Sequence, residues 1–141
     1  MYCVTHFLAG AIVGASMPGP LGAACAGIAS HAVLDAVPHS DYSRAWQGVI
    51  DVACAGLVAL VILMAGADVR ALAGGVGGAV PDIEVAAAFL FPGAYRPHGR
   101  LRLVFPSHSG FLGHGRLELP WGVLTQVVAI AGLAALFLWA S

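Results

Sequence analysis

Charged residues are scarce in this chain, and lysine is missing altogether. Only 9% of the 141 residues are charged; the six basic ones are all arginine, and with seven acidic residues the net charge is −1. Roughly a quarter of the residues in soluble globular domains are charged, and a nucleic-acid-binding protein needs surplus positive charge to displace counterions. The composition therefore argues against a soluble domain, a disordered chain and a partner that is a nucleic acid.

The chain also lacks the motifs of several common sites. Cys3, Cys25 and Cys54 stand in apolar sequence and form no C-x-x-C pair, which argues against thiolate metal sites and redox motifs. No Walker motif, dinucleotide-binding motif or G-x-S-x-G elbow is present. The first seven residues carry no Arg or Lys, so we expect this segment to be retained rather than cleaved as a signal peptide.

What the chain does have is long apolar runs, since 60% of its residues are hydrophobic. The cleanest runs, 49–67 and 120–140, are about 20 residues long, which is enough for a helix to cross a bilayer. Trp46, Trp121 and Trp139 suit anchors at the membrane interface. These features predict an all-α, polytopic integral membrane protein, with all 141 residues in a single domain.

Two further apolar segments are interrupted. The first is broken at Met17-Pro18-Gly19-Pro20, where Pro and Gly predict a tight turn, so we expect a helical hairpin with arms at 4–16 and 21–37. The second, 69–91, contains paired glycines and Pro81. It is either one helix broken near Pro81 or two helices that meet there. We expect about five membrane segments, with the glycines of the fourth permitting close helix packing.

The positions of the arginines predict the orientation. Arg96, Arg100, Arg102 and Arg116 all lie between the fourth and fifth segments, and the positive-inside rule places that loop in the cytoplasm. Counting back, the N-terminus and the loop at 39–47 lie on the same side, and the chain ends on the opposite side.

Ionisable side chains inside the apolar segments are the main functional signal. They are His6, His31, Asp35, Asp51, Asp82 and Glu84. A carboxylate at the centre of a membrane helix costs roughly 2.5–3.5 kcal/mol on insertion scales, so each must be paired, hydrated, protonated or bound to a cation. Such residues are by default a hypothesis for a functional site.

The spacing of His31 and Asp35 sharpens that hypothesis. The two residues are four apart and share one face of a helix, and His39 follows directly after Pro38. Two imidazoles and one carboxylate suit Zn²⁺, Mn²⁺ or Fe²⁺. A plain His–Asp hydrogen bond with a solvated loop histidine fits the same pattern, and the spacing leaves both interpretations open.

The predicted topology brings further residues to the same face. His6, His31, His39, His108 and His114 can all converge on the cytoplasmic side. Asp82 follows Pro81 and would lie at a helix N-terminus, either as a ligand or as a simple capping group. The Gly-rich segment 108–114 predicts a loop folded over this face, or an interfacial loop in contact with lipid headgroups.

At these residues the chain resembles bacterial inner-membrane proteins known as membrane-bound metal-dependent hydrolases. Thr5-His6, the Ser-His-x-x-x-Asp segment from Ser30 to Asp35, and Pro81-Asp82-Ile83-Glu84 match motifs of that family, the last with Glu in place of Asp. Residues 108–114 resemble its histidine loop, without the Arg and with one extra residue, and the motif order differs. The chain is also similar to short, uncharacterised bacterial membrane proteins with an early Ser-His-x-x-x-Asp-x-x-Pro-His segment.

The resemblance implies a metal site, hydrolysis of a phosphoester or lipid headgroup, and a multi-pass location in the bacterial inner membrane. We expect a divalent transition metal, zinc first and manganese or iron as alternatives. The expected metal ligands are His6, His31, Asp35, Asp82 and His114. A bound metal lowers the pKa of a coordinated water towards neutrality.

Other residues have expected roles around this site. Glu84 is a candidate general base or orienting residue, and His39 and His108 are candidate catalytic residues or reserve ligands. The candidate phosphate-binding residues are Arg100, Arg102 and Arg116.

A function of another class fits the same residues. The chain could be a small non-enzymatic subunit of a larger membrane complex, or an ion- or proton-conducting component. Asp35, Asp51 and Asp82 would then pair with arginines of a partner or carry protons. The glycine-rich faces fit helix–helix association equally well. The expected partners are membrane lipids and either a homo-oligomer or a larger membrane complex. The metal content of the purified protein distinguishes the two functions, because bound transition metal supports the hydrolase, and no metal with a co-purifying partner supports the subunit.

Overall fold

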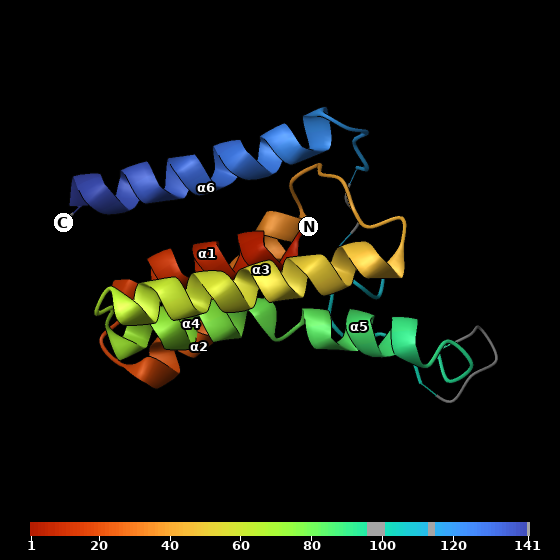
Figure 1. Ribbon diagram of the computed structural model, residues 1–141, viewed down its shortest axis with the longest axis horizontal. Helices are drawn as coiled ribbons and strands as arrows, with labels where there is room; N and C mark the ends of the chain where they lie inside the picture. The colour runs from red at the N-terminus through yellow and green to blue at the C-terminus, as the bar shows by residue number, and fades with distance from the viewer. Residues whose placement is uncertain (96–100, 113–114, 141) are drawn as a thin grey trace.

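The computed structural model describes residues 1–95, 101–112 and 115–140. This part of the chain forms helices and contains no β-strand, as the sequence predicted. Most of the helices run along the long axis of the molecule (Figure 1). Their bounds are α1 (Cys3–Ala15), α2 (Pro20–Asp35), α3 (Ala45–Met64), α4 (Val69–Ala79), α5 (Asp82–Leu90) and α6 (Trp121–Ala140).

The N-terminal helical hairpin is confirmed. α1 ends at Ala15, and α2 begins at Pro20 after a turn that contains Pro18 and Gly19. Proline suits the first position of a helix because its missing amide donor would have no partner there in any case. α2 ends at Asp35, three residues before Pro38, and so presents Asp35 at its C-terminal end.

The fourth segment is two helices rather than one. α4 ends at Ala79 and α5 begins at Asp82, with an angle of 44° between them. Pro81 is the N-cap of α5, and the amide of Glu84 donates back to its carbonyl. Of the two alternatives that the sequence left open, the structure therefore has the second, two helices that meet at Pro81.

α4 packs against α1 and α2 through glycines. A Cβ atom at Gly74 or Gly78 would overlap the carbonyl oxygens of Gly10 and His6 in α1, and one at Gly77 would overlap that of Ala24 in α2. The three backbones can approach this closely only because these positions lack side chains. The predicted role of the glycines in close helix packing is confirmed. We call the contact of Gly74, Gly77 and Gly78 with α1 and α2 the glycine seam.

The expectation of five membrane segments is not supported. Within the described residues α3 alone is long and apolar enough to cross a membrane, and α4 with α5 would form a second, bent span. α1 has 13 residues and is therefore only about 20 Å long, short of the ~30 Å of a bilayer core. The turn that creates the hairpin is also what shortens its first arm.

α3 has an outer face that is both apolar and exposed. Its buried residues are Asp51 and Ala55, whereas Val52, Leu57, Val61 and Met64 are each more than half exposed. Apolar exposure on this scale is typical of a surface that faces lipid or another protein.

The glycine seam yields a stability prediction. We expect Gly74→Ala to lower the free energy of unfolding by about 1–3 kcal/mol, because the added methyl group overlaps the Gly10 backbone and forces α1 and α4 apart. Gly56→Ala in α3 is the matched control, since nothing lies within 4 Å of a Cβ there. Thermal unfolding of both variants in detergent measures the difference, and equal melting temperatures would contradict the prediction.

Candidate metal centre

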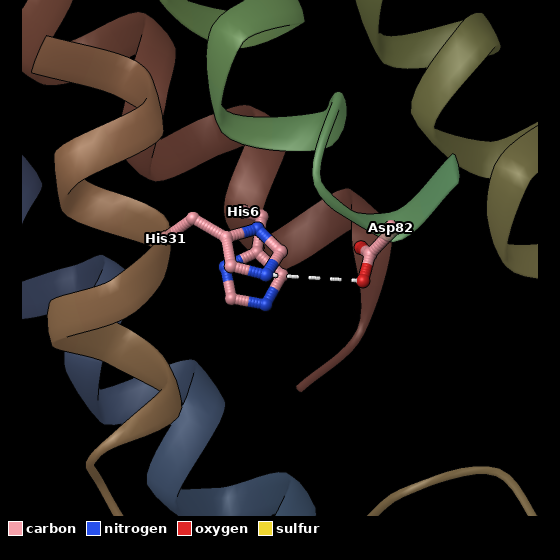
Figure 2. Close-up of side chains that lie close together, drawn as sticks. All are labelled: His6, His31 and Asp82. Atoms are coloured by element: carbon pink, nitrogen blue, oxygen red, sulfur yellow. Dashed lines mark ion pairs between the residues drawn. The ribbon is translucent and has the colours of Figure 1, made fainter. Parts of the chain in front are cut away.

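The candidate site is built around Asp35, which is 2% exposed at the end of α2. His31 lies one turn earlier on the same helix, and His6 comes from α1. Asp82 is the first residue of α5, and His108 belongs to the loop that precedes α6. Figure 2 shows His6 and His31 with their rings one over the other and Asp82 beside them. The rings are stacked with centroids 3.6 Å apart, and both side chains are fully buried.

Hydrogen bonds at the far side of two imidazoles fix which nitrogens face the site. His31 Nδ1 donates to the carbonyl oxygen of Gly78 over 2.7 Å. His108 Nδ1 lies 2.8 Å from Glu84 Oε1 and donates to that carboxylate. A neutral imidazole has a single N–H, so in the neutral form the Nε2 atoms of both rings carry lone pairs. These two lone pairs point at the carboxylates of Asp35 and Asp82.

Four acceptor atoms thus converge, and we call them the primary site: Nε2 of His31 and of His108, Oδ2 of Asp35 and Oδ1 of Asp82. His31 Nε2 lies 3.3 Å from His108 Nε2, 3.1 Å from the Asp35 oxygen and 3.9 Å from the Asp82 oxygen. His108 Nε2 lies 3.6 Å and 3.7 Å from the same two oxygens. Ligands on a tetrahedral metal with bonds of about 2.0–2.1 Å are about 3.3–3.4 Å apart. The distances among His31, His108 and Asp35, from 3.1 to 3.6 Å, are close to this spacing, whereas the Asp82 oxygen lies somewhat farther from both imidazoles.

Buried polar atoms without hydrogen bonds mark the same place. Within the described part of the chain, both ring nitrogens of His6 and Oδ2 of Asp82 have no hydrogen-bond partner. His6 Nε2 lies 3.0 Å from Asp35 Oδ1, but this contact lacks hydrogen-bond geometry. Leaving one buried donor or acceptor unsatisfied costs about 1–3 kcal/mol. A cation among these atoms would remove that cost, so the residues present fit a divalent metal.

Glu84 and Ser107 hold the site together. Glu84 accepts hydrogen bonds from the amides of Val104 and Phe105, each over 2.9 Å, in addition to that from His108. It thereby fixes the loop that carries His108. Ser107 Oγ donates to Asp35 Oδ2 over 2.5 Å. Burial lowers the pKa of His108, which favours the neutral imidazole that metals bind.

Asp51 serves a different purpose from the other carboxylates in the apolar segments. It accepts hydrogen bonds from the amides of Cys3 and Val4, over 2.5 and 3.1 Å, and from the hydroxyl of Tyr42. A carboxylate at the N-terminus of a helix interacts favourably with its dipole. Asp51 therefore caps α1 and fixes the helix that carries His6.

The structure places the remaining predicted residues as follows. His39 Nε2 lies 4.0 Å from Asp35 Oδ1 and 3.0 Å from Asp41 Oδ1. Arg116 Nε lies 3.2 Å from Asp41 Oδ2, so its guanidinium contacts a carboxylate, and Arg102 is exposed. His114 and Arg100 fall outside the described residues. The roles given to these residues from the sequence stay predictions.

Two residues of the site were missed in the sequence. No sequence pattern identifies Ser107 as a site residue, apart from its position directly before His108. Asp41 forms a His-x-Asp pair with His39, and that pairing could have identified it.

No protein-family model, curated protein or solved structure matches this chain. The resemblance to membrane-bound metal-dependent hydrolases therefore stays a prediction, and the chemistry of the site is inferred from its geometry.

Asp82 provides a direct test of the primary site. We expect Asp82→Asn to lower metal affinity at least about tenfold, since changes even to residues that only support a ligand cost about 10–100-fold. Membrane insertion should be normal, because a neutral amide is cheaper to bury than a carboxylate. The control is Asp68→Asn, a carboxylate that pairs with Arg70 on the surface. The measurement is metal content after dialysis against a chelator, and full retention by Asp82→Asn would contradict a metal at this position.

Proposed function

We propose that the protein is a membrane-embedded, metal-dependent hydrolase that acts on an amphiphilic phosphoester. The observation that carries the proposal is the convergence of His31 Nε2, His108 Nε2 and Asp35 Oδ2, which lie 3.1–3.6 Å apart, close to the ligand spacing of a tetrahedral metal, with an Asp82 oxygen beside both imidazoles. Two imidazoles and two carboxylates suit zinc, manganese or iron. A divalent metal bound there would supply a Lewis acid and activate water.

The protein residues have separable roles in this proposal. Gly78 and Glu84 each accept the Nδ1–H of one histidine and so direct its Nε2 towards the site. Ser107 holds one oxygen of Asp35. Glu84 already accepts from three donors, which favours the orienting role over that of general base, the other role expected from the sequence.

An apolar groove beside Asp82 supports an amphiphilic substrate. The groove has a volume of about 260 Å³ and lies between α3 and α5, where its lining includes Val52, Phe89 and Leu90. Arg44 and Asp82 line the same groove. We infer that an acyl chain occupies the apolar part, and that Arg44 attracts the anionic phosphate, a role that guanidinium groups perform well.

We also propose a multi-pass location in a bacterial inner membrane. The exposed apolar face of α3 supports membrane insertion, and the bent pair of α4 and α5 would form a second segment. In this arrangement α1, α2 and α6 lie within the bilayer beside α3. The break at Pro81 then brings Asp82 towards one face of the membrane, which is the cytoplasmic face by the arginine rule.

The decisive experiment combines metal analysis with a hydrolysis assay. The full chain, purified in detergent, is analysed for bound transition metals and then incubated with vesicles that contain phosphatidic acid or phosphatidylglycerol. We expect bound metal, and release of phosphate or headgroup that stops on chelation and in Asp82→Asn. Absence of bound metal together with a co-purifying membrane partner would overturn the proposal in favour of the non-enzymatic subunit.

The groove yields its own prediction. Ala86 lines it from α5, so Ala86→Trp should fill it and lower kcat/KM for long-chain substrates about tenfold, which corresponds to ~1.4 kcal/mol. Hydrolysis of a short-chain analogue should be unchanged because the primary site is not altered. Leu57→Trp, on the exposed face of α3, is the matched control. If both chain lengths were affected equally, the groove would not be the site of the acyl chain.

A further inference from the structure

A second apolar groove borders α5, besides the one between α3 and α5, which we call the α3–α5 groove. The second groove has a volume of about 670 Å³. The residues that line it include Ile28 of α2, Ile83 and Ala87 of α5, and Val104 and Phe105 of the loop that precedes α6. The groove is open to its surroundings, since Val104 is 82% and Ile83 64% exposed.

The two grooves use different faces of α5. Residues that are four apart share one face of a helix. Ile83 and Ala87 line the second groove, whereas Asp82, Ala86 and Leu90 line the α3–α5 groove. The adjacent residues Ala86 and Ala87 therefore face different grooves, and α5 lies between the two.

Both grooves begin at residues of the primary site or in contact with it. Asp82, whose Oδ1 belongs to the primary site, lines the α3–α5 groove. Glu84 and Phe105 line the second groove. The ring of Phe105 packs edge-on against that of His31, with centroids 5.0 Å apart, and Glu84 accepts from Nδ1 of His108 over 2.8 Å. A headgroup at the primary site therefore has one groove on each side of α5.

The chemistry of the second groove suits a hydrocarbon chain. Among the described residues that line it, Glu84 is the only charged one, and its carboxylate already accepts hydrogen bonds from two amides and from His108. That carboxylate is therefore already engaged by donors of the chain itself. A hydrocarbon chain needs only apolar surface, because its binding is driven by the removal of that surface from water.

The sizes of the grooves point to one chain in each. The volume of the α3–α5 groove, about 260 Å³, is below the ~300–1,000 Å³ of pockets that hold drug-sized ligands, so this groove is small for two acyl chains. The second groove, with about 670 Å³, lies within that range. A glycerophospholipid carries two acyl chains on one headgroup, and its second chain needs a place of its own beside the primary site.

We propose that the substrate is a two-chain phospholipid that straddles α5, with its phosphoester at the primary site, one acyl chain in the α3–α5 groove and the other in the second groove. The inference rests on the proposed function and deepens it, because it narrows the amphiphilic phosphoester to a lipid with two chains. A lysophospholipid has a single chain and leaves the second groove empty. Hydrolysis of one-chain and two-chain lipids therefore separates the contributions of the two grooves.

The test compares Ala87→Trp with Ala86→Trp in the full chain, purified in detergent. The substrates are phosphatidic acid and lysophosphatidic acid with acyl chains of equal length. We expect Ala87→Trp to lower kcat/KM for phosphatidic acid about tenfold, the effect of displacing about two buried methylene groups, and to leave hydrolysis of lysophosphatidic acid unchanged. Ala86→Trp should lower kcat/KM for both lipids. Leu57→Trp, on the exposed face of α3, is the matched control and should lower neither.

The outcomes separate the two-chain substrate from the proposed function. An equal effect of Ala87→Trp on both lipids, or no effect on either, would overturn the two-chain substrate and leave the hydrolase standing. Hydrolysis of neither lipid by the wild type would overturn the proposed function. Circular dichroism and metal content of each variant confirm an intact fold and primary site, and Ala87→Leu fills part of the groove should Ala87→Trp fail to fold.

A binding experiment tests the second groove without any reaction. Phosphatidic acid with a photoreactive diazirine at the end of each acyl chain is cross-linked to the wild type, and mass spectrometry locates the labelled residues. We expect more label at Ile83 and Val104 than at Met64, which is 80% exposed on α3, and Ala87→Trp should remove this preference. Equal labelling of the second groove and of α3 would overturn the second groove as the site of an acyl chain.

Discussion

The close approach of the α4 backbone to α1 and α2 is the constraint on which the rest of the structure depends. Because glycines occupy the contact, the Gly78 carbonyl reaches His31 and accepts its Nδ1–H over 2.7 Å. α4 ends at Ala79, one residue after Gly78, and the break at Pro81 then places Asp82 near His31. A side chain at the seam would separate the helices and remove both the orienting carbonyl and the second carboxylate.

The consequence of this packing is a buried excess of hydrogen-bond acceptors. Gly78, Val37 and Glu84 take the Nδ1–H groups of His31, His39 and His108, and in its neutral form each ring turns a lone pair towards a carboxylate. Such lone pairs repel the carboxylate oxygens unless protons or cations lie between them. Protons would make these contacts ordinary ion pairs and would suit the conducting component. The close spacing of His31, His108 and Asp35, and the ring nitrogens of His6 that have no hydrogen-bond partner among the described residues, favour a metal.

Much of the fold and part of the site could be predicted from local sequence. The turn at Pro18 and Gly19 defined the hairpin, the four-residue spacing of His31 and Asp35 put both on one face, and Pro81 marked a break. The backbone carbonyls that orient the histidines have no side-chain pattern to reveal them. The number of membrane spans was overestimated because hydropathy counts apolar residues, whereas α1 is too short to cross.

The partial charges at the helix ends add an electrostatic field at the same site. α2 ends at Asp35 and α4 ends one residue after Gly78, so two helix C-termini lie near the histidines. Each C-terminus carries roughly half a negative charge in its unpaired carbonyls, which attracts a cation. α5 begins at Asp82, and the partial positive charge of its N-terminus acts in the opposite direction, against a cation. The C-termini of α2 and α4 and the carboxylates of Asp35 and Asp82 therefore favour a positive ion at this site, and the Asp82 carboxylate offsets the N-terminus of α5.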